Sequence, residues 1–303
     1  MKKRSIYPSV ILLTLVFALG FNGSVSAAAT PGLGQAASFG ILSNTYTNTV
    51  SGTTLNGDLG YTTGPVVAAT VNGALYVPPS STYTQAGIDQ GTALANLNAQ
   101  PCTSIGAIVA LDAYDVDGAG PLAPGTFPPG CYSSTGAMNI TTGTTVTLSG
   151  TGTYVFRPGG ALTSGANSVV SLAGGASACD IFWAPVAATT LGANSTFAGT
   201  DVDASGITIG NTVTWTGHAL AFGGTVTTTR DTINVPSCTA AAPGSGAGTT
   251  GSSSTSSSAS AVPGMPDTGF APGGNSSIVW KVVTPAVALI AVTTLYLARK
   301  KWA

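Results

Sequence analysis

Short runs in which an apolar residue and a threonine alternate recur through residues 139–236 of this chain. Five copies align on a second residue that is always threonine: Thr141, Thr163, Thr190, Thr208 and Thr227. The intervals between these threonines are 22, 27, 18 and 19 residues, and a glycine follows at a fixed phase in the first four copies. Such a period, with β-prone runs and a phased glycine, is typical of stacked coils. The pattern therefore predicts a β-solenoid.

Alternation along each strand predicts which side chains point inward. In the first strand of the copies the inward residues are Ile140, Leu162, Ile207 and Val226, and the aligned threonines point outward. In the second strand Leu148, Val170, Phe197 and Trp215 point inward, and Thr147, Val169, Thr196 and Thr214 point outward. The sixth residue of each copy, Thr145, Asn167, Asn194 or Thr212, joins the outward candidates. Because stacked coils repeat roughly every 4.8 Å, these side chains are expected to form a regular grid of hydroxyls and methyls.

Two further segments are predicted to have regular structure. Residues 33–77 are β-prone and punctuated by glycine, with a turn signal at Asn56-Gly57-Asp58, and should add coils to the solenoid. Thr82–Gln100 is the one convincing helix, because Thr82-Tyr83-Thr84-Gln85 matches a capping box and Pro101 ends the run. Two internal glycines weaken this helix, so it should need packing against the solenoid.

Charged residues make up only 6% of the chain, and all lysines and arginines except Arg157 and Arg230 lie near its two ends. Between residues 28 and 264 there are two arginines and nine aspartates, a net charge of −7. Nucleic acid is bound through clustered lysine and arginine, and an electrostatic grip on anionic lipid also needs basic side chains. The composition argues against both partners and predicts a neutral surface of small side chains.

Four cysteines, an even number, fit disulfides in an exported protein. Four cysteines allow three pairings that sequence cannot distinguish, and we predict Cys102–Cys131 and Cys179–Cys238. The spacings are long, and the single histidine, His218, supplies no ligand cluster. No metal site is therefore expected.

No combination of residues has the pattern of a catalytic site. His218 has no serine or cysteine partner in a recognisable motif. Asp201 and Asp203 are spaced to share one face of a strand, and two such carboxylates on a solenoid are expected to be solvated. Residues 112–118 carry three aspartates but lack the distal acidic ligand of a calcium loop, so a solvated loop is expected. We predict no enzyme activity and no cofactor.

The two ends of the chain carry export and anchoring signals. Residues 1–27 combine a basic start, a short apolar run and a Val25-Ser26-Ala27 cleavage site, as in a secretory signal. Residues 28–238 form the expected solenoid domain, and residues 239–264, almost all Ala, Gly, Ser and Thr, form a flexible tether. Residues 265–303 then contain Met-Pro-Asp-Thr-Gly, an apolar transmembrane run at 282–298 and a basic tail.

This C-terminal order resembles the sortase sorting signal of surface proteins in cell-walled bacteria, whose motif is Leu-Pro-x-Thr-Gly. Met265 stands here in place of the leucine. The resemblance implies cleavage between Thr268 and Gly269 and attachment of Thr268 to peptidoglycan. A plain membrane anchor is the alternative, and the basic tail is cytoplasmic in both cases. Either anchor places the solenoid at the cell surface.

Leu33–Leu42 and Leu55–Gly60 look like the opening of the ice-binding-like family of microbial antifreeze proteins. Other segments similar to that family's motifs are Pro124–Tyr132, Gly152–Phe156, Ala178–Trp183, Leu191–Phe197 and Gly217–Ala221. The resemblance implies a mainly β fold, a discontinuous right-handed parallel β-solenoid of triangular cross-section with one long helix alongside. It also implies ice adsorption through a face that often carries Thr-Ala/Gly-x-Thr/Asn, a pattern that Thr142–Thr145 matches.

Two functions fit these expectations. An ice-binding protein would use the stiff threonine side chains, which lose little freedom on binding, to hold water in a regular array. A surface adhesin or structural display protein would use the same solenoid to bind a glycan or another cell. Threonine also favours exposed strand positions, so the grid is equally expected for stability alone.

Overall fold

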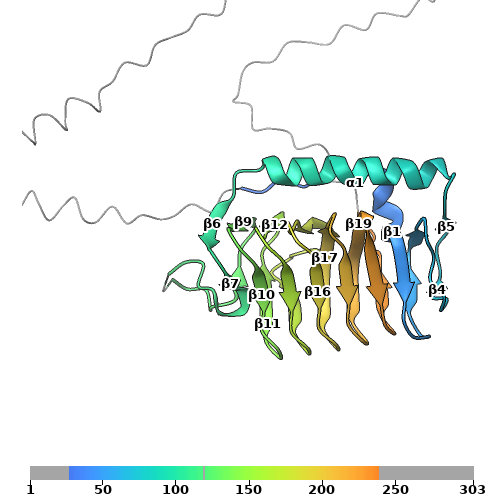
Figure 1. Ribbon diagram of the computed structural model, residues 1–303. Coiled ribbons are helices and arrows are strands. Elements are labelled where there is room, and N and C mark those ends of the chain that lie inside the picture. Colours follow the sequence, from blue (N-terminus) through green and yellow to red (C-terminus); the bar gives the residue numbers. More distant parts are fainter. Residues whose placement is uncertain (1–26, 119, 239–303) are drawn as a thin grey trace, which may run out of the picture. The chain divides into compact units, whose positions relative to one another are not determined.

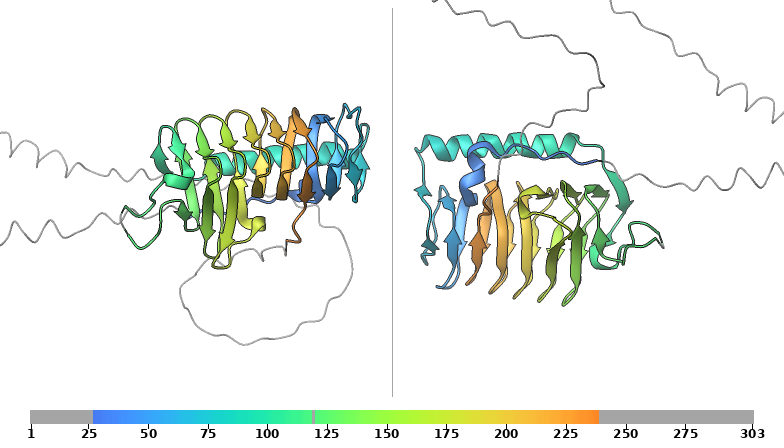
Figure 2. Two further views of the ribbon diagram at one scale, coloured as in Figure 1. Left: turned by 90° about the horizontal axis from the view of Figure 1, so that it is seen from below. Right: turned by 180° about the vertical axis from the view of Figure 1, so that it is seen from behind.

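The computed structural model describes residues 27–118 and 120–238 of the 303-residue chain. These residues belong to one compact unit that ends at Ala242. The unit is a β-solenoid whose strands pair in parallel from coil to coil, with one long helix alongside (Figures 1 and 2). The predicted fold class is confirmed. The tether, the sorting signal and all but the last residue of the secretory signal lie outside the described residues.

Columns of paired strands define three faces of the solenoid. Face 1 consists of β7 (Val109–Ala110), β10 (Met138–Ile140), β13 (Leu162–Ser164), β16 (Thr189–Leu191), β18 (Ile207–Ile209) and the ends of β19 (Thr214–Thr228) and β1 (Phe39–Asn48). Face 2 consists of β8 (Thr126–Phe127), β11 (Thr145–Ser149), β14 (Val169–Ala173), the starts of β17 (Thr196–Val202) and β19, then β20 (Thr232–Asn234), β2 (Thr54–Asn56) and β4 (Thr70–Val71). Face 3 consists of β6 (Thr103–Gly106), β9 (Gly130–Ser134), β12 (Tyr154–Arg157), β15 (Ile181–Trp183), the end of β17, the middle of β19, the start of β1, then β3 (Asp58–Gly60) and β5 (Leu75–Tyr76). Within the described residues, the connections contain the short 3-10 helices η2 (Gly34–Ser38), η3 (Leu111–Ala113) and η4 (Ala178–Asp180).

The coils are not stacked in chain order. Strand β1 pairs with β19, with Ile41 opposite Ala219, and with β3 on its other side, with Leu42 opposite Gly60. The N-terminal coils therefore extend the C-terminal end of the stack (Figure 1). Helix α1 (Ser81–Ala99) then runs back along the solenoid, from β5 to β6 at the opposite end.

Helix α1 begins one residue before the predicted start, and its N-cap is Ser80. The Ser80 hydroxyl accepts a hydrogen bond from the Tyr83 backbone nitrogen at 3.3 Å. The predicted capping box at Thr82 is wrong, because Ser80 already has the extended cap conformation and Thr82 lies inside the first turn. No helix in the two described ranges is long and apolar enough to cross a membrane.

Two hydrophobic cores hold the solenoid together. Inside the coils, aromatic rings of successive turns pack against one another. The centroid distances are 5.3 Å for the T-shaped pair Phe127–Phe156, 4.4 Å for the stacked pair Phe156–Trp183 and 5.1 Å for the tilted pair Trp183–Phe197. The eight residues predicted to point inward are all buried. The second core lies between face 3 and α1, and its members include Leu42, Tyr83, Leu97, Val155, Phe182 and Leu220.

Both predicted disulfides are present. Cys102–Cys131 joins the segment after α1 to β9, with a Cα–Cα distance of 4.5 Å. Cys179–Cys238 joins η4 to the last described residue, with a Cα–Cα distance of 5.6 Å. Because both cores and both disulfides lie on the N-terminal side of Ala242, residues 28–242 contain what is needed to fold as a unit.

Candidate functional site

Face 1 carries a single outward rank of polar side chains in unbroken register. Its members, coil by coil, are Asn139, Thr163, Thr190, Thr208, Thr227 and Thr47. The residues on either side of each member in the strand point inward and are buried, as Met138 and Ile140 illustrate. Five threonines thus follow one another at a coil spacing of roughly 4.8 Å. The structure brings four of the five predicted threonines together in this rank.

The exception is Thr141. Met138 pairs with Leu162, so Asn139 occupies the place predicted for Thr141. Thr141 lies two residues further on, where its backbone nitrogen donates to the Asp112 carboxylate at 2.8 Å. The predicted alignment is wrong there because both apolar–polar pairs, 138–139 and 140–141, satisfy strand alternation.

The corner between faces 1 and 2 fixes this register. Asn167, Asn194 and Thr212 have positive φ angles of 57°, 57° and 60°, and Gly143 has φ 72° at the equivalent place. Asparagine and glycine tolerate this left-handed conformation better than other residues. The Thr212 hydroxyl donates to the Asn194 side-chain oxygen. The predicted candidates Asn167, Asn194 and Thr212 therefore form an exposed row at the corner. They do not belong to the outward side chains of the strands on face 1 or face 2.

Face 2 carries two outward ranks on the same strands. The first consists of Thr145, Val169, Thr196, Thr214, Thr232, Thr54 and Thr70. The second includes Thr147, Ser171, Thr216, Asn234, Asn56 and Asn72. In the second rank, side-chain amides link Asn72 to Asn56 and Asn56 to Asn234, each at 2.6 Å. Face 2 is interrupted, because β14 and β17 pair only at Val169 and Thr196.

Sequence reasoning placed Thr145, Thr147, Thr196 and Thr214 outward, and the structure agrees. It missed the other threonines and asparagines of face 2. Their signal is present in the sequence as Thr-x-Asn at Thr54–Asn56, Thr70–Asn72 and Thr232–Asn234. The same reasoning also left Asn139 out of face 1.

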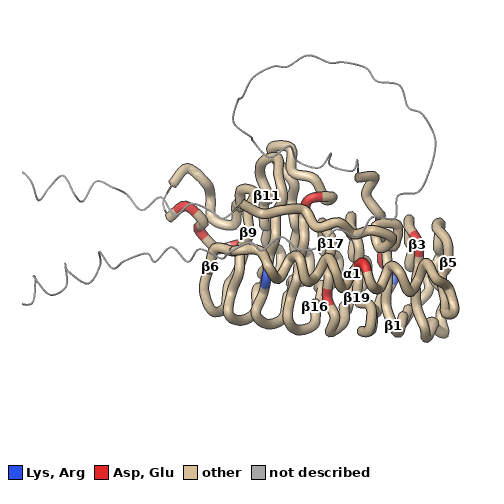
Figure 3. Tube along the Cα trace, turned by 90° about the horizontal axis from the view of Figure 1, so that it is seen from above, with Lys and Arg blue, Asp and Glu red and all other residues tan. Residues whose placement is uncertain are grey.

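None of the three outward ranks, one on face 1 and two on face 2, contains a charged side chain. The charges of the described residues lie on α1, in η3 and the loop after it, in η4, on face 3 and inside the solenoid. Figure 3 marks these positions along the chain. Arg230 is the exception, since it is exposed at the corner between faces 1 and 2. Face 3 is covered by α1, so faces 1 and 2 are left as two neutral surfaces of small polar side chains.

The fold agrees with what comparison with known proteins finds. The profile of a family described as "Ice-binding-like" matches residues 26–234. This chain belongs to the Ice-binding-like family. It is 31% identical over 216 residues to an ice-binding protein of Flavobacterium frigoris (strain PS1), covering 67% of this chain and 76% of that one. It is 29% identical over 242 residues to an ice-binding protein of a Colwellia species, covering 75% and 93% of the two chains.

The Ice-binding-like fold is also found among solved structures. The crystal structure of an ice-binding protein from the Antarctic ascomycete Antarctomyces psychrotrophicus superposes with a TM-score of 0.58 and 26% identity. The match covers 69% of this chain and 100% of that one. An ice-binding protein from an Arctic yeast, at 23% identity and a TM-score of 0.57, shares the fold.

Asp201 and Asp203 of this Ice-binding-like chain are buried, and the prediction that they are solvated is wrong. Asp201 pairs with Trp183 and Ala219 in β15 and β19, so its side chain points into the solenoid. It is 0% exposed, and among the described residues its carboxylate interacts with only one donor, the Thr189 hydroxyl, outside ordinary hydrogen-bond geometry. Burial, and then the neighbouring Asp203, raise the pKa of Asp201 well above its ordinary value. Asp203 caps the turn that follows it, accepting from the Ser205 backbone nitrogen at 2.6 Å, and it also accepts from the Thr189 backbone nitrogen of the neighbouring coil at 2.9 Å.

His218, Asp115 and Asp117, the other titratable residues considered in the sequence analysis, make hydrogen bonds that stabilise the fold of this family member. His218 is buried on face 3, where Nδ1 donates to the Phe39 carbonyl at 2.7 Å and burial lowers its pKa. In the loop after η3, Asp115 accepts from the Gly118 nitrogen at 2.9 Å, and Asp117 accepts from the Leu122 nitrogen at 3.0 Å. Across the described ranges, no three His, Cys, Asp or Glu side chains gather as a metal site would require.

Proposed function

We propose that this protein binds ice through face 1. The observation that carries the proposal is the rank of five threonines, Thr163, Thr190, Thr208, Thr227 and Thr47, in adjacent coils without a register break. Relatives that carry the name ice-binding protein support the activity. Face 1 is uncovered and lacks charged side chains in its outward rank, which suits a neutral, periodic surface such as ice.

The physical basis is preorganisation. Each threonine presents one hydroxyl and one methyl, and its β-branch leaves χ1 little freedom to lose on binding. Buried neighbours fix the strands, so hydroxyls repeat with the coil spacing of roughly 4.8 Å and can order water with that period. Each contact is weak, and the rigid spacing lets many weak contacts add. Face 2 offers similar chemistry, but its break between β14 and β17 shortens the regular array.

Matched tyrosine substitutions test both the activity and the choice of face. Residues 28–242 should shape ice crystals and slow recrystallisation. Thr190→Tyr and Thr208→Tyr place a ring on face 1, and Thr214→Tyr places the same ring on face 2; all three threonines are exposed. We expect the face 1 variants to lose about tenfold in activity, equivalent to roughly 1.4 kcal/mol of adsorption, with the circular dichroism spectrum and melting temperature unchanged.

Each other outcome has a definite meaning. Loss in Thr214→Tyr alone would move the ice surface to face 2. Failure of the parent protein to shape ice at high concentration would reject ice binding and leave a surface adhesin, which recognises a glycan or another cell, as the function. A screen of residues 28–242 against immobilised glycans would then be the direct measurement.

The protein is exported and held at the cell surface by its C-terminal segment. Two disulfides in the described residues support export, because such bonds persist in oxidising compartments. Attachment to peptidoglycan would follow cleavage between Thr268 and Gly269, and otherwise residues 282–298 would anchor the chain in the membrane. Mass spectrometry of digested cell-wall fractions decides between them, since only wall attachment yields a peptide that ends at Thr268 joined to a wall fragment.

A further inference from the structure

A cavity of about 490 Å³ opens on the helix-covered side of the solenoid. One wall is the N-terminal segment 30–37, and the opposite wall contains Phe182 and His218 of face 3. The Cys179–Cys238 disulfide closes a third side. This volume lies in the range of pockets that bind small molecules, which are mostly apolar with a few placed polar groups.

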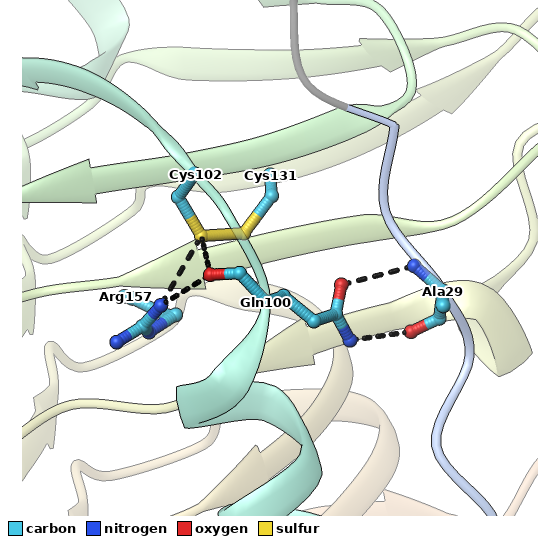
Figure 4. The surroundings of a disulfide bond; sticks show 5 residues. All are labelled: Ala29, Gln100, Cys102, Cys131 and Arg157. Carbon is cyan, nitrogen blue, oxygen red and sulfur yellow. Dashed lines mark hydrogen bonds between the residues drawn. A yellow bond between two sulfur atoms is a disulfide. The ribbon is translucent and has the colours of Figure 1, made fainter. Parts of the chain in front are cut away.

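The N-terminal wall is held firmly in place. Gln100, at the end of α1, accepts from the Ala29 nitrogen at 2.9 Å and donates to the Ala29 carbonyl at 2.7 Å (Figure 4). The Gln100 carbonyl in turn accepts from Arg157 at 2.9 Å. At the other end of the segment, Asp89 accepts from the Gln35 nitrogen at 2.7 Å. The cavity is therefore preformed, and a ligand would not need to order its wall.

Two of the polar side chains that line the cavity, His218 and Asp180, offer hydrogen-bond acceptors. His218 is only 2% exposed, and its Nδ1 proton is committed to the Phe39 carbonyl, so Nε2 of the neutral ring is an acceptor. The described residues give Nε2 no partner. The half-buried Asp180 carboxylate also lines the cavity, with only a long contact of 3.4 Å from the Thr30 hydroxyl. No lysine or arginine lines the cavity to neutralise it.

We propose that this cavity binds a small organic ammonium compound with a short apolar chain. The apolar part would lie against Leu33 and Phe182, and the ammonium group, which has donors and no acceptor, would donate to His218 Nε2 and Asp180. An organic carboxylate with a chain of the same length would instead face two hydrogen-bond acceptors, His218 Nε2 and Asp180, and the negative charge of Asp180 would repel it. The cavity is on the side away from face 1, so this proposal does not depend on ice binding.

The experiment uses residues 28–242 with n-hexylammonium chloride and, as the matched anion, sodium n-hexanoate. Titration followed by NMR should give saturable shifts at the His218 ring nitrogens and the Thr30 amide with hexylammonium only. Asp180→Asn should weaken binding about tenfold. Ala37→Phe should abolish it, because Ala37 is exposed on η2 and lines the cavity, so a ring there fills the space. Asp117→Asn, which removes the same charge from a loop outside the cavity, should leave the affinity unchanged.

Retained signal dispersion in the Ala37→Phe spectrum separates a filled cavity from an unfolded chain. The proposal is overturned by equal shifts with hexanoate, by shifts that do not saturate, or by full affinity in both Asp180→Asn and Ala37→Phe. Absence of hexylammonium binding to the parent protein overturns it as well.

Discussion

The side-chain oxygen of Gln90, in the middle of α1, accepts a hydrogen bond from the backbone nitrogen of Phe222 in β19 at 2.9 Å. Gly87, one turn earlier, lies over the ring of Phe222, so a Cβ there would come within 2.5 Å of the ring. These two contacts seat the helix on the solenoid. The glycine that lowers the helix propensity of α1 is thus also what lets the helix approach.

The two glycines of α1 are expected to respond oppositely to alanine. Gly91→Ala should stabilise the protein by up to about 1 kcal/mol, because nothing lies within 4 Å of its added methyl and alanine is the better helix former. Gly87→Ala should destabilise it by about 1–3 kcal/mol through overpacking against Phe222. Urea unfolding of residues 28–242 measures both. Equal stabilisation by the two substitutions would contradict the close approach of α1.

Asp201 predicts a stability that falls with rising pH. Its pKa is raised in the folded protein and ordinary in the unfolded chain, so the folded state holds a proton that the unfolded state releases. Its contribution is complete below about pH 4 and is lost as pH rises through the folded pKa, by at most about 1.4 kcal/mol per pH unit. Asp231, with a pKa raised to about 6, adds to the loss between pH 4 and 6.

Asp201→Asn should flatten this dependence, because the amide has the same shape and does not ionise. The free energy of unfolding, measured from pH 4 to pH 8, is expected to fall less steeply in the variant, which becomes the more stable protein at high pH. An unchanged slope would mean that the Asp201 carboxyl is solvated after all.

The disulfide that closes the cavity should make a large contribution to stability. Cys179 and Cys238 are 59 residues apart, and the loss of loop-closure entropy in the unfolded chain corresponds to about 4 kcal/mol. The double substitution Cys179→Ser, Cys238→Ser is expected to lower the unfolding free energy by that amount. The matched change at Cys102 and Cys131, 29 residues apart, should cost slightly less. An insignificant change in either variant would show that the unfolded chain is already compact.

The corner row predicts a reciprocal pair of substitutions. Thr212 has φ 60° and a β-branched side chain, whereas Asn194, one coil away, holds φ 57° with a side chain suited to it. Thr212→Asn should raise stability by up to about 1 kcal/mol, and Asn194→Thr should lower it by a similar amount. Thermal unfolding of the two variants beside the parent is the measurement. A shift of both melting temperatures in the same direction would argue against the shared corner conformation.

Much of the fold follows from local sequence rules. The repeat of apolar and threonine residues predicts parallel coils, and Trp215 and Phe197 are buried where alternation places them. Both disulfide pairings and the helix alongside were also predicted correctly. The strand and helix predictions depend on strand parity and on the residues near each element, which a sequence displays directly, whereas the disulfide pairing is one of the three that four cysteines allow.

The register of face 1, the burial of Asp201 and the position of the cavity depend instead on how the coils pack against one another. Strand parity allows Leu162 to pair with either Met138 or Ile140, and only the left-handed corner at Gly143 and Asn167 selects Met138. Parity also shows that Asp201 and Asp203 share one side of their strand, but it does not show whether that side faces the core or solvent. The pairing of Asp201 with the buried Trp183 places this side in the core. The location of the cavity could not be foreseen, because it forms where segments distant in sequence meet.

The stacking of β1 on β19 bears on how the chain matures. Phe39, the first residue of β1, and His218, in β19, are hydrogen-bonded across 179 residues of sequence. A solenoid stacked in chain order can gain coils one at a time as synthesis proceeds. Here the early strands pair with one another, β1 with β3 and β2 with β4, but their other edge has no partner until β19 and β20 have been made. The delay slows closure and favours a late, cooperative collapse. A chain that stays open until its last coil arrives is well suited to pass through a secretion channel before it folds.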